Sequence, residues 1–317
     1  MSVSASKKGI FPTMITPYTA DGQVDLNGVE ALVEWYWKKG CEGIFALCQS
    51  SEIRYLSLDE RLKIGKCVLD KAKALAKADK SRPPMTIVAS SHVSDDFEAQ
   101  VNELTATAEL GFDCVILITN RLDIENTSDE KWIEDLNRLV ARLPKDVSLG
   151  LYECPLPYKR LLTEKMLKAC KETGRFTFCK DTCCDALEIK KRIQILEGST
   201  LGLYNANAQT LLETWRAGAV GYSGVMANFH PELYRYLFAH QNEEPSDLLQ
   251  AFICLSAFTE VMPYPATAKY YLNEFEGVPI QTYSRSVDHT LLTDYHKDCL
   301  RQMKLLSDKI KEDLKID

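Results

Sequence analysis

The chain has 317 residues, of which 45% are hydrophobic and 26% charged, and its formal net charge is −7. This composition is typical of a globular protein, and the length allows one large α/β domain or two small ones. The excess of acidic residues argues against binding to nucleic acid, which requires a basic surface. No apolar run approaches the roughly 20 residues that a membrane-spanning helix needs, so we expect no insertion into a membrane.

The cysteines indicate a reducing compartment. There are eleven, an odd number, and they are scattered along the chain. Residues 1–8 lack the apolar core of a signal peptide, so we expect a cytoplasmic protein with free thiols. Cys179, Cys183 and Cys184 lie close together but have no second ligand pair at the spacing of a zinc site. We therefore expect no bound metal.

Short apolar segments rich in β-forming residues alternate with longer amphipathic segments. The predicted strands cover residues 9–15, 43–47, 85–89, 113–118, 147–152, 175–180, 200–204 and 219–223. The predicted helices cover residues 26–39, 58–78, 95–110, 129–143, 164–173, 185–197 and 208–217. Ser57 and Glu60 form the pattern of a capping box at the start of the second helix, and Ser128 marks the start of the fourth.

This alternation predicts an α/β fold, a (β/α)8 barrel (TIM barrel) with parallel strands. A doubly wound open sheet is the alternative, but that fold usually has a glycine-rich nucleotide loop after its first strand, and none occurs here. We assign residues 1–240 to a catalytic barrel. We assign residues 241–317, which contain further helical segments, to a C-terminal helical extension packed on the barrel.

Lys180 ends the sixth predicted strand. Burial of an ammonium group costs free energy unless the group is paired or neutral, so we expect its pKa to fall. A lysine with a lowered pKa is a nucleophile that can form a Schiff base with a carbonyl substrate. The alternative is a side chain that bends out of the strand end to meet a carboxylate.

Other polar residues follow the strand ends, where barrel enzymes carry their chemistry. Tyr152, at the end of the neighbouring fifth strand, could transfer protons for an imine, or could be a rim aromatic with its hydroxyl in water. The turn 48–52 offers N–H groups and hydroxyls to a carboxylate such as that of pyruvate, or could be a simple strand–helix connection. His92, after the third strand, is either catalytic or a polar rim residue.

Several motifs occur together in a characteristic order. They are Ile15-Thr16-Pro17, the segment from Gly43 to the turn that ends in Glu52, Tyr152-x-x-Pro155, Lys180-Asp181, and Gly218-Ala219-x-Gly221 followed by Ala227-Asn228. In order and spacing, residues 9–287 resemble the dihydrodipicolinate synthase / N-acetylneuraminate lyase superfamily, the pyruvate-handling class I aldolases.

The resemblance implies a role for each matching residue. Lys180 would form the imine with pyruvate, and Tyr152 would be the proton-relay phenol. Ser50 and the amide of Ser51 would hold the pyruvate carboxylate, and the Ser223 carbonyl would line the site. The resemblance also implies a homotetramer, or a homodimer, that uses no metal or dissociable cofactor.

The chain departs from the family pattern in the turn 48–52. The family has Gly-Thr/Ser-Thr-Gly-Glu, whereas this chain has Cys48-Gln49-Ser50-Ser51-Glu52. Both glycines are absent, so we expect the backbone here to avoid conformations that only glycine adopts cheaply. Gln49 replaces the relay hydroxyl, and Arg121 or a neighbouring polar residue replaces the relay tyrosine that the family contributes across a subunit interface. The proton relay is therefore altered.

Two named activities are disfavoured by further departures. Pro157 occupies the position of the arginine with which the synthase binds its second substrate, and Ala208 and Gln209 occupy the positions of the sugar-binding Asp-Glu pair of the sialic-acid lyase.

The polar residues at the strand ends instead suggest a hydroxylated substrate. Gln49, Asn205 and Asn207 would form a polar pocket, with the Arg121 guanidinium available for an anionic group, which suits a 2-keto-3-deoxy sugar acid. We therefore predict a Schiff-base-forming lyase that cleaves or forms a C–C bond on pyruvate or a 2-oxo acid. The alternatives are a dihydrodipicolinate synthase, a 2-oxo-acid dehydratase, and a non-catalytic binding or regulatory homologue.

Overall fold

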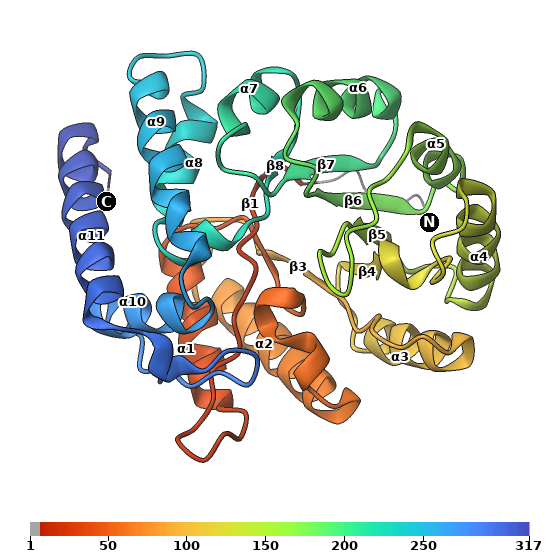
Figure 1. The fold of residues 1–317 in the computed structure, drawn as a ribbon, viewed down its shortest axis with the longest axis horizontal. Helices are drawn as coiled ribbons and strands as arrows, with labels where there is room; N and C mark the ends of the chain where they lie inside the picture. Colours follow the sequence, from red (N-terminus) through yellow and green to blue (C-terminus); the bar gives the residue numbers. More distant parts are fainter. Residues whose placement is uncertain (1–6, 317) are drawn as a thin grey trace.

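Eight short parallel strands form the centre of the molecule, and helices cover them on the outside (Figure 1). The structure is a computed structural model that describes residues 7–316. The strands are β1 (Gly9–Ile10), β2 (Gly43–Phe45), β3 (Thr86–Ala89), β4 (Cys114–Ile118), β5 (Leu149–Tyr152), β6 (Phe176–Asp181), β7 (Gly202–Asn205) and β8 (Gly221–Tyr222). The barrel helices are α1 (Leu26–Lys38), α2 (Leu58–Ala78), α3 (Phe97–Glu109), α4 (Asp129–Arg142), α5 (Glu164–Glu172), α6 (Ala186–Leu196), α7 (Leu211–Arg216) and α8 (Pro231–Ala239).

The strands follow one another around the barrel in the order β1-β8-β7-β6-β5-β4-β3-β2, and every neighbouring pair is parallel. Just after β1 the chain also meets β2, where the Phe45 amide donates to the carbonyl of Pro12 at 2.9 Å and the Met14 amide donates to the carbonyl of Phe45 at 3.0 Å. The (β/α)8 prediction is confirmed. The first strand is shorter than predicted, since Pro12 has no N–H with which to continue its ladder.

Side-chain caps fix where the helices begin. The Glu60 amide donates to Ser57 Oγ at 3.2 Å, and the Ser57 amide donates to Glu60 Oε2 at 2.8 Å, so the predicted capping box is present. Helix α7 starts later than predicted because the side chain of Asn207 accepts from the Thr210 amide at 3.0 Å and holds the preceding residues in a turn.

The core has two parts. Inside the barrel, the Phe178 ring stacks on Tyr204 with 4.1 Å between the ring centroids, and the Phe45 ring meets the edge of Tyr152 at 5.5 Å. A larger apolar layer lies between the strands and the surrounding helices. Because side chains fill the barrel interior, a ligand site is expected at one end of it, where the strands stop.

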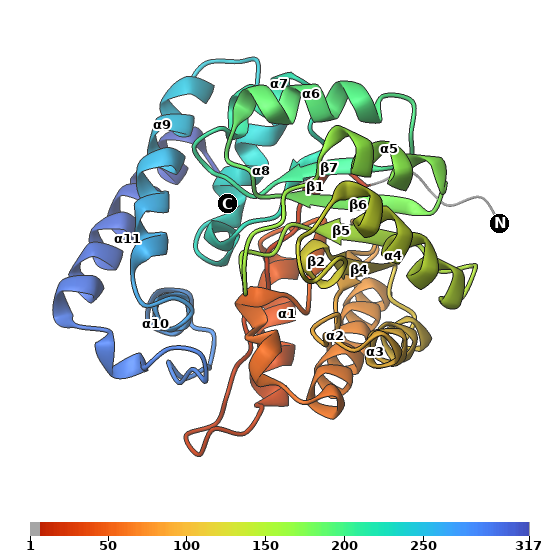
Figure 2. The same ribbon diagram turned by 45° about the vertical axis from the view of Figure 1, so that its right-hand side comes forward.

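The predicted C-terminal extension consists of three helices, α9 (Ser246–Ser256), α10 (Ala266–Glu276) and α11 (Asp294–Leu314). They gather on one side of the barrel, where α9 contacts α7 and α8 (Figures 1 and 2). A buried ion pair attaches the extension to the turn after β2: Lys269 Nζ lies 3.0 Å from Glu52 Oε1. Glu52 also accepts from Ser284 Oγ at 2.8 Å and from the Ser286 amide at 2.7 Å. This part of the chain is therefore connected directly to the end of the barrel at which strand β2 stops.

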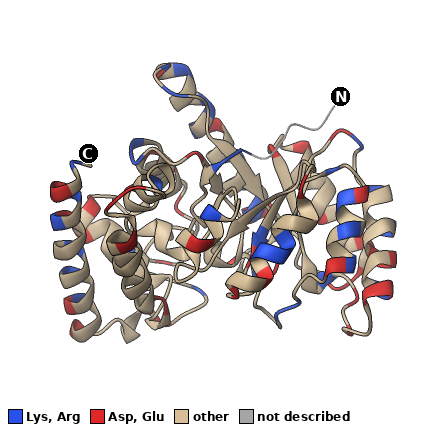
Figure 3. Ribbon diagram, turned by 90° about the horizontal axis from the view of Figure 1, so that it is seen from above, with Lys and Arg blue, Asp and Glu red and all other residues tan. Residues whose placement is uncertain are grey.

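Basic and acidic residues are interspersed on the outer helices (Figure 3). Several form pairs one helical turn apart, for example Lys66 with Asp70 at 2.7 Å, as expected of solvated helix faces. Within residues 7–316, no helix is long and apolar enough to cross a membrane, and no group of three or more His, Cys, Asp and Glu side chains is arranged to hold a metal ion.

Candidate active site

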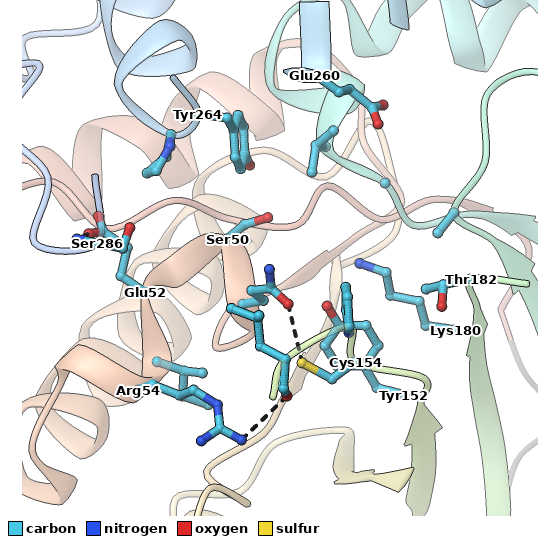
Figure 4. Close-up of a pocket in the computed structure, with 18 of the residues that line it drawn as sticks. Ser50, Glu52, Arg54, Tyr152, Cys154, Lys180, Thr182, Glu260, Tyr264 and Ser286 are labelled. Carbon is cyan, nitrogen blue, oxygen red and sulfur yellow. Dashed lines mark hydrogen bonds between the residues drawn. The ribbon is translucent and has the colours of Figure 1, made fainter. Parts of the chain in front are cut away.

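A cavity of about 510 Å³ lies where the strands end. Its wall includes residues from the segments after β2, β5, β6, β7 and β8, together with residues of the C-terminal extension (Figure 4). Of the residues predicted for the site, the following line the cavity: Gln49, Ser50, Tyr152, Lys180 and Asn207. The carboxyl ends of the strands are where barrel enzymes place their chemistry, so this cavity is the candidate active site.

Lys180 is the fifth residue of β6, and only 4% of its surface is exposed. Its Nζ lies 4.6 Å from the centre of the Tyr152 ring and 5.8 Å from that of Phe45. Across the part of the chain that the structure describes, no carboxylate oxygen lies within 4.0 Å of this nitrogen, so the side chain does not bend out to form an ion pair. Burial lowers the pKa of Lys180, which favours the neutral, nucleophilic amine.

Tyr152 is the partner of Lys180 across the β5–β6 ladder. Its phenol is buried, and burial raises the pKa of the hydroxyl well above its ordinary value, so the group keeps its proton at neutral pH. A protonated phenol beside an amine can donate to an oxygen that is bound between them and can accept the proton back.

The turn 48–52 contains a short 3₁₀ segment, Gln49–Ser51, that begins at the cavity. Ser50 lines the cavity, and its Oγ lies 3.1 Å from Thr13 Oγ1. Among residues 7–316, no acceptor is present for the amides of Gln49 and Ser50, which are the first N–H groups of this helical turn. The turn therefore presents donors suited to a carboxylate.

Ser51 stabilises this turn through hydrogen bonds to the barrel backbone and is not part of the cavity wall. Its Oγ lies 2.8 Å from the Met14 carbonyl and 2.9 Å from the Ala46 carbonyl, and its amide donates to the Cys48 carbonyl at 3.1 Å. The expectation about the missing glycines holds, because Cys48 has an extended backbone and Ser51 has no positive φ. The left-handed conformation falls one residue later, at Glu52, with φ 60°.

Two other predicted site residues are buried beneath the cavity. The Asn205 side chain donates to Thr210 Oγ1 at 3.0 Å and to Thr214 Oγ1 at 2.9 Å, so it shapes the turn before α7. Ser223 is fully buried, and the residues that follow it, Gly224 and Val225, line the cavity in its place.

Arg121 lies outside the cavity wall, because its guanidinium is paired with Asp95 and donates to Asn120 at 3.1 Å. The anion contact that the sequence suggested for Arg121 therefore has no support in the geometry. Two other cations, Arg54 and Lys159, line the cavity instead.

His92 is a core histidine in this structure. It is fully buried, its Nδ1 accepts from the Ile118 amide at 3.0 Å, and it does not line the cavity. Burial lowers the pKa of His92 to about 4, so the ring is neutral at physiological pH.

The sequence did not predict the cavity residues that come from the extension. Glu260 belongs to a short 3₁₀ segment, Ala257–Val261, and Tyr264 follows it; both line the cavity (Figure 4). The Tyr264 hydroxyl accepts from Asn228 Nδ2 at 3.1 Å and lies near the hydroxyls of Ser50 and Thr13. Pro263 and Pro265, which interrupt the helical pattern here, are the one local signal that the chain turns back toward the barrel.

A buried ionic network lies behind the two central residues. Arg192, on α6, donates to Glu153 Oε1 at 2.8 Å and to Asp181 Oδ2 at 2.5 Å, and all three side chains are almost completely buried. The two carboxylates directly follow Tyr152 and Lys180 in the chain. The network therefore fixes the ends of β5 and β6 relative to each other.

A barrel with a buried lysine and a tyrosine side by side at the ends of neighbouring strands, and with backbone N–H donors in the same cavity wall, has the chemical groups that imine-forming aldolases use. Comparison with known proteins agrees. The dihydrodipicolinate synthetase family matches residues 6–286. The chain therefore belongs to this family, and it is a carbon–carbon lyase.

Individual relatives are distant. The 4-hydroxy-tetrahydrodipicolinate synthase of Methanothrix thermoacetophila is 24% identical over 224 residues, which are 71% of this chain and 70% of the relative. The crystal structure of dihydrodipicolinate synthase DapA-2 from Bacillus anthracis matches 94% of this chain and 98% of its own chain, with a TM-score of 0.81 and 16% sequence identity. YagE from Escherichia coli K12, a family member solved in complex with pyruvate, matches 94% of this chain and 99% of its own chain, with a TM-score of 0.79 and 19% sequence identity. At these identities the solved structures show the fold alone.

Proposed function

We propose that the protein forms an imine between Lys180 and pyruvate, or a related 2-oxo acid, and uses it to cleave or form a C–C bond. The observation that carries this proposal is the buried Lys180 amine, which lacks an ion-pair partner within residues 7–316 and lies next to Tyr152 in the cavity wall. The complex of the family member YagE with pyruvate supports the choice of ligand.

The residues of the cavity suit the steps of such a reaction. A protonated imine withdraws electrons from the neighbouring carbon and so stabilises the enamine that forms when the C–C bond breaks. Tyr152 keeps its proton at neutral pH and is paired with Lys180 across the β5–β6 ladder, so it would give a proton to a substrate oxygen beside the Lys180 imine and take it back. The amides of Gln49 and Ser50 and the Ser50 hydroxyl would bind the carboxylate of the 2-oxo acid.

The rest of the cavity favours a hydroxylated partner. Gln49 and Asn207 supply amide groups, and Arg54 and Lys159 supply positive charge farther along the wall. A 2-keto-3-deoxy sugar acid would therefore suit the cavity. Incubation with such acids, followed by product analysis, separates the alternatives: an aldolase releases pyruvate and an aldehyde, whereas a dehydratase releases water and keeps the carbon chain intact.

Borohydride trapping is the direct test of the proposal. The protein is incubated with pyruvate, reduced, and analysed by intact mass and peptide mapping. The expected result is an adduct on Lys180 in the natural protein and in Lys159→Ala, a matched control that removes the second lysine of the cavity wall. The absence of an adduct at saturating pyruvate would eliminate pyruvate as the carbonyl substrate and favour another oxo acid or a non-catalytic binding protein.

We propose a cytoplasmic homotetramer or homodimer as the working form. The outer side of the extension carries large exposed apolar side chains: Leu248, Leu255, Phe258 and Val261 are 63–88% exposed. Such clusters mark association surfaces. Light scattering after gel filtration should give a multiple of the monomer mass, and Phe258→Asp should lower the apparent mass. A monomeric natural protein would refute the oligomer.

A further inference from the structure

Glu260 is a carboxyl group in the cavity wall with no assigned role. Its side chain makes no hydrogen bond or ion pair with any residue from 7 to 316, although basic side chains line the same cavity. The side-chain amine of Lys180 likewise has no hydrogen-bond partner in that range. Figure 4 shows the Glu260 carboxyl and the Lys180 amine on the wall of the same cavity. The space between two such groups is where a ligand bound to Lys180 would lie.

The fold holds Glu260 in this position. Its segment, 257–261, is attached to the barrel by two buried residues, Ala257 and Thr259. Thr259 Oγ1 lies 2.8 Å from the Ser256 carbonyl and 3.6 Å from the Met226 sulfur, on the chain that follows β8. Phe258 and Val261 point to the outside of the molecule. The packing of these residues holds the segment against the barrel with Glu260 at the cavity wall.

We propose that Glu260 is the general acid–base of imine formation: it protonates the hydroxyl that leaves when the Lys180 carbinolamine loses water. This inference rests on the imine chemistry proposed above. The neutral Lys180 amine adds to the C2 carbonyl and gives a neutral carbinolamine. The Glu260 carboxyl then gives its proton to the C2 hydroxyl, the C2–O bond breaks, and the nitrogen lone pair forms the C=N bond. The products are a protonated imine, a Glu260 carboxylate and one water molecule. In hydrolysis the carboxylate takes a proton from the attacking water.

The surroundings of Glu260 match this role. Glu260 is exposed to solvent at the cavity, yet the surrounding wall removes enough water from its carboxyl to raise the pKa to about 7, although the nearby Lys180 acts in the opposite direction. A group with a pKa near the working pH both donates and accepts protons efficiently. The other titratable groups that act on it or are affected by it are Lys180, Cys184, Tyr222, Tyr234 and Tyr264. Burial raises the pKa of that thiol and of those phenols, so they keep their protons at neutral pH.

The location of Glu260 gives the extension a chemical function. The turn 48–52 carries Gln49 at the position where the resemblance places a relay hydroxyl, so it offers one proton-relaying hydroxyl fewer beside the imine. Glu260 belongs to the same chain as Lys180 and lies in residues 241–317, which the sequence analysis assigned to a helical extension packed on the barrel. The acid–base group would thus be supplied from the C-terminal part of the same subunit.

The test compares the rate and pH dependence of imine formation in Glu260→Gln and Glu274→Gln. Glu274, on α10, is exposed and does not line the cavity, which makes it a matched control. Each protein is mixed with pyruvate, quenched with borohydride at timed intervals, and weighed by mass spectrometry between about pH 5 and pH 9. We expect Glu260→Gln to form the adduct about 10²-fold more slowly and to lose the dependence on a group titrating near neutral pH, while reaching the same final amount. Glu274→Gln should behave as the natural protein.

The outcomes are distinguishable. No adduct in the natural protein would refute the imine itself. A natural adduct together with an unchanged rate and pH profile in Glu260→Gln would overturn the role of Glu260 alone. In a third outcome, Glu260→Gln would keep the change in rate near neutral pH and shift only the part of the pH–rate profile that reports the Lys180 amine. Glu260 would then act only as a charge beside that amine, and its role as acid–base would be overturned. Glu260→Asp, which keeps the carboxyl, should recover part of the rate and covers the case in which Glu260→Gln does not fold.

Discussion

The network of Arg192, Glu153 and Asp181 gives a sharp prediction about how the candidate active site is held together. Arg192→Met leaves two carboxylates that are fully buried and have lost their cation. It also removes the hydrogen bond from Arg192 to the Leu162 carbonyl at 2.7 Å. Removing one partner of a buried ion pair costs about 3–5 kcal/mol, because the remaining charge is neither solvated nor compensated. We expect a loss of unfolding free energy of about that size in urea titrations at neutral pH.

The pH dependence of this loss has a definite sign. Burial and the neighbouring Asp181 raise the pKa of Glu153, and Arg192 opposes them, so removing Arg192 raises this pKa further. The unfolded carboxyl titrates at about 4.3, so above that pH the unfolded state ionises while the folded state retains its proton. In the natural protein the pKa of Glu153 is already raised to about 7, so between about pH 4.3 and pH 7 both proteins lose stability alike, and the stability deficit of Arg192→Met should grow only as the pH rises above about 7.

Two controls complete the experiment. Lys191→Met removes an exposed cation from the same helix and should change the stability little. Arg192→Lys keeps the positive charge but loses the planar guanidinium that contacts both carboxylates, so its free energy of unfolding should lie between those of the natural protein and Arg192→Met. A loss below about 1 kcal/mol for Arg192→Met, or a deficit that shrinks with rising pH, would refute the reasoning, since a network worth so little could not fix the ends of β5 and β6.

Three further predictions follow from the same geometry. Lys180→Ala should abolish turnover and borohydride trapping, and Tyr152→Phe should slow turnover by about 10²–10⁴-fold, measured as steady-state kinetics; turnover of Lys180→Ala near the natural rate would end the proposal. Burial lowers the pKa of His92 and His230 to about 4, whereas an unfolded histidine titrates near 6.5. The unfolded state therefore binds more protons between these values, and urea titrations should show stability falling as the pH drops from about 6.5 to about 4; no such fall would contradict the burial of both rings. A chain cut after residue 240, where it is recovered in soluble form, should form the pyruvate adduct at least about 10²-fold more slowly, since Glu260 is missing; adduct formation at the natural rate would contradict this.

The barrel could be predicted from the sequence because its signals are local. Each strand is a short apolar run, and the helix starts at Ser57 and Ser128 carry their own capping side chains. That Tyr152 and Lys180 lie on neighbouring strands also follows from chain order, since β5 and β6 are consecutive parallel strands; their direct pairing does not, because the register shifts between Leu149 and Gly150. The ends of the elements were less predictable, as at Pro12 and Asn207, where a missing donor or a competing side chain decides the boundary.

The cavity wall was predictable only in part, because it depends on where side chains point after packing. Ser51 and Asn205 occupy strand-end positions as predicted, but each satisfies buried backbone or hydroxyl groups. Arg121 illustrates the same limit, since its partner Asp95 lies 26 residues away in the chain and no local pattern connects the two. Glu260 and Tyr264 could not be found at all without knowing how the extension returns to the barrel.

The cavity residues that come from the extension share a physical origin that bears on function. The turn after β2 has replaced two glycines and a hydroxyl by larger side chains, and Glu52 at its end is held by Lys269 and by the chain at 284–286. The same extension brings Glu260 and Tyr264 to the cavity. A substitution that loosens the Glu52–Lys269 pair should therefore disturb the turn after β2 together with the chain at 284–286, whereas Glu260 is held separately by the packing of Ala257 and Thr259. In this chain the C-terminal helices are better regarded as one wall of the active site than as a support outside it.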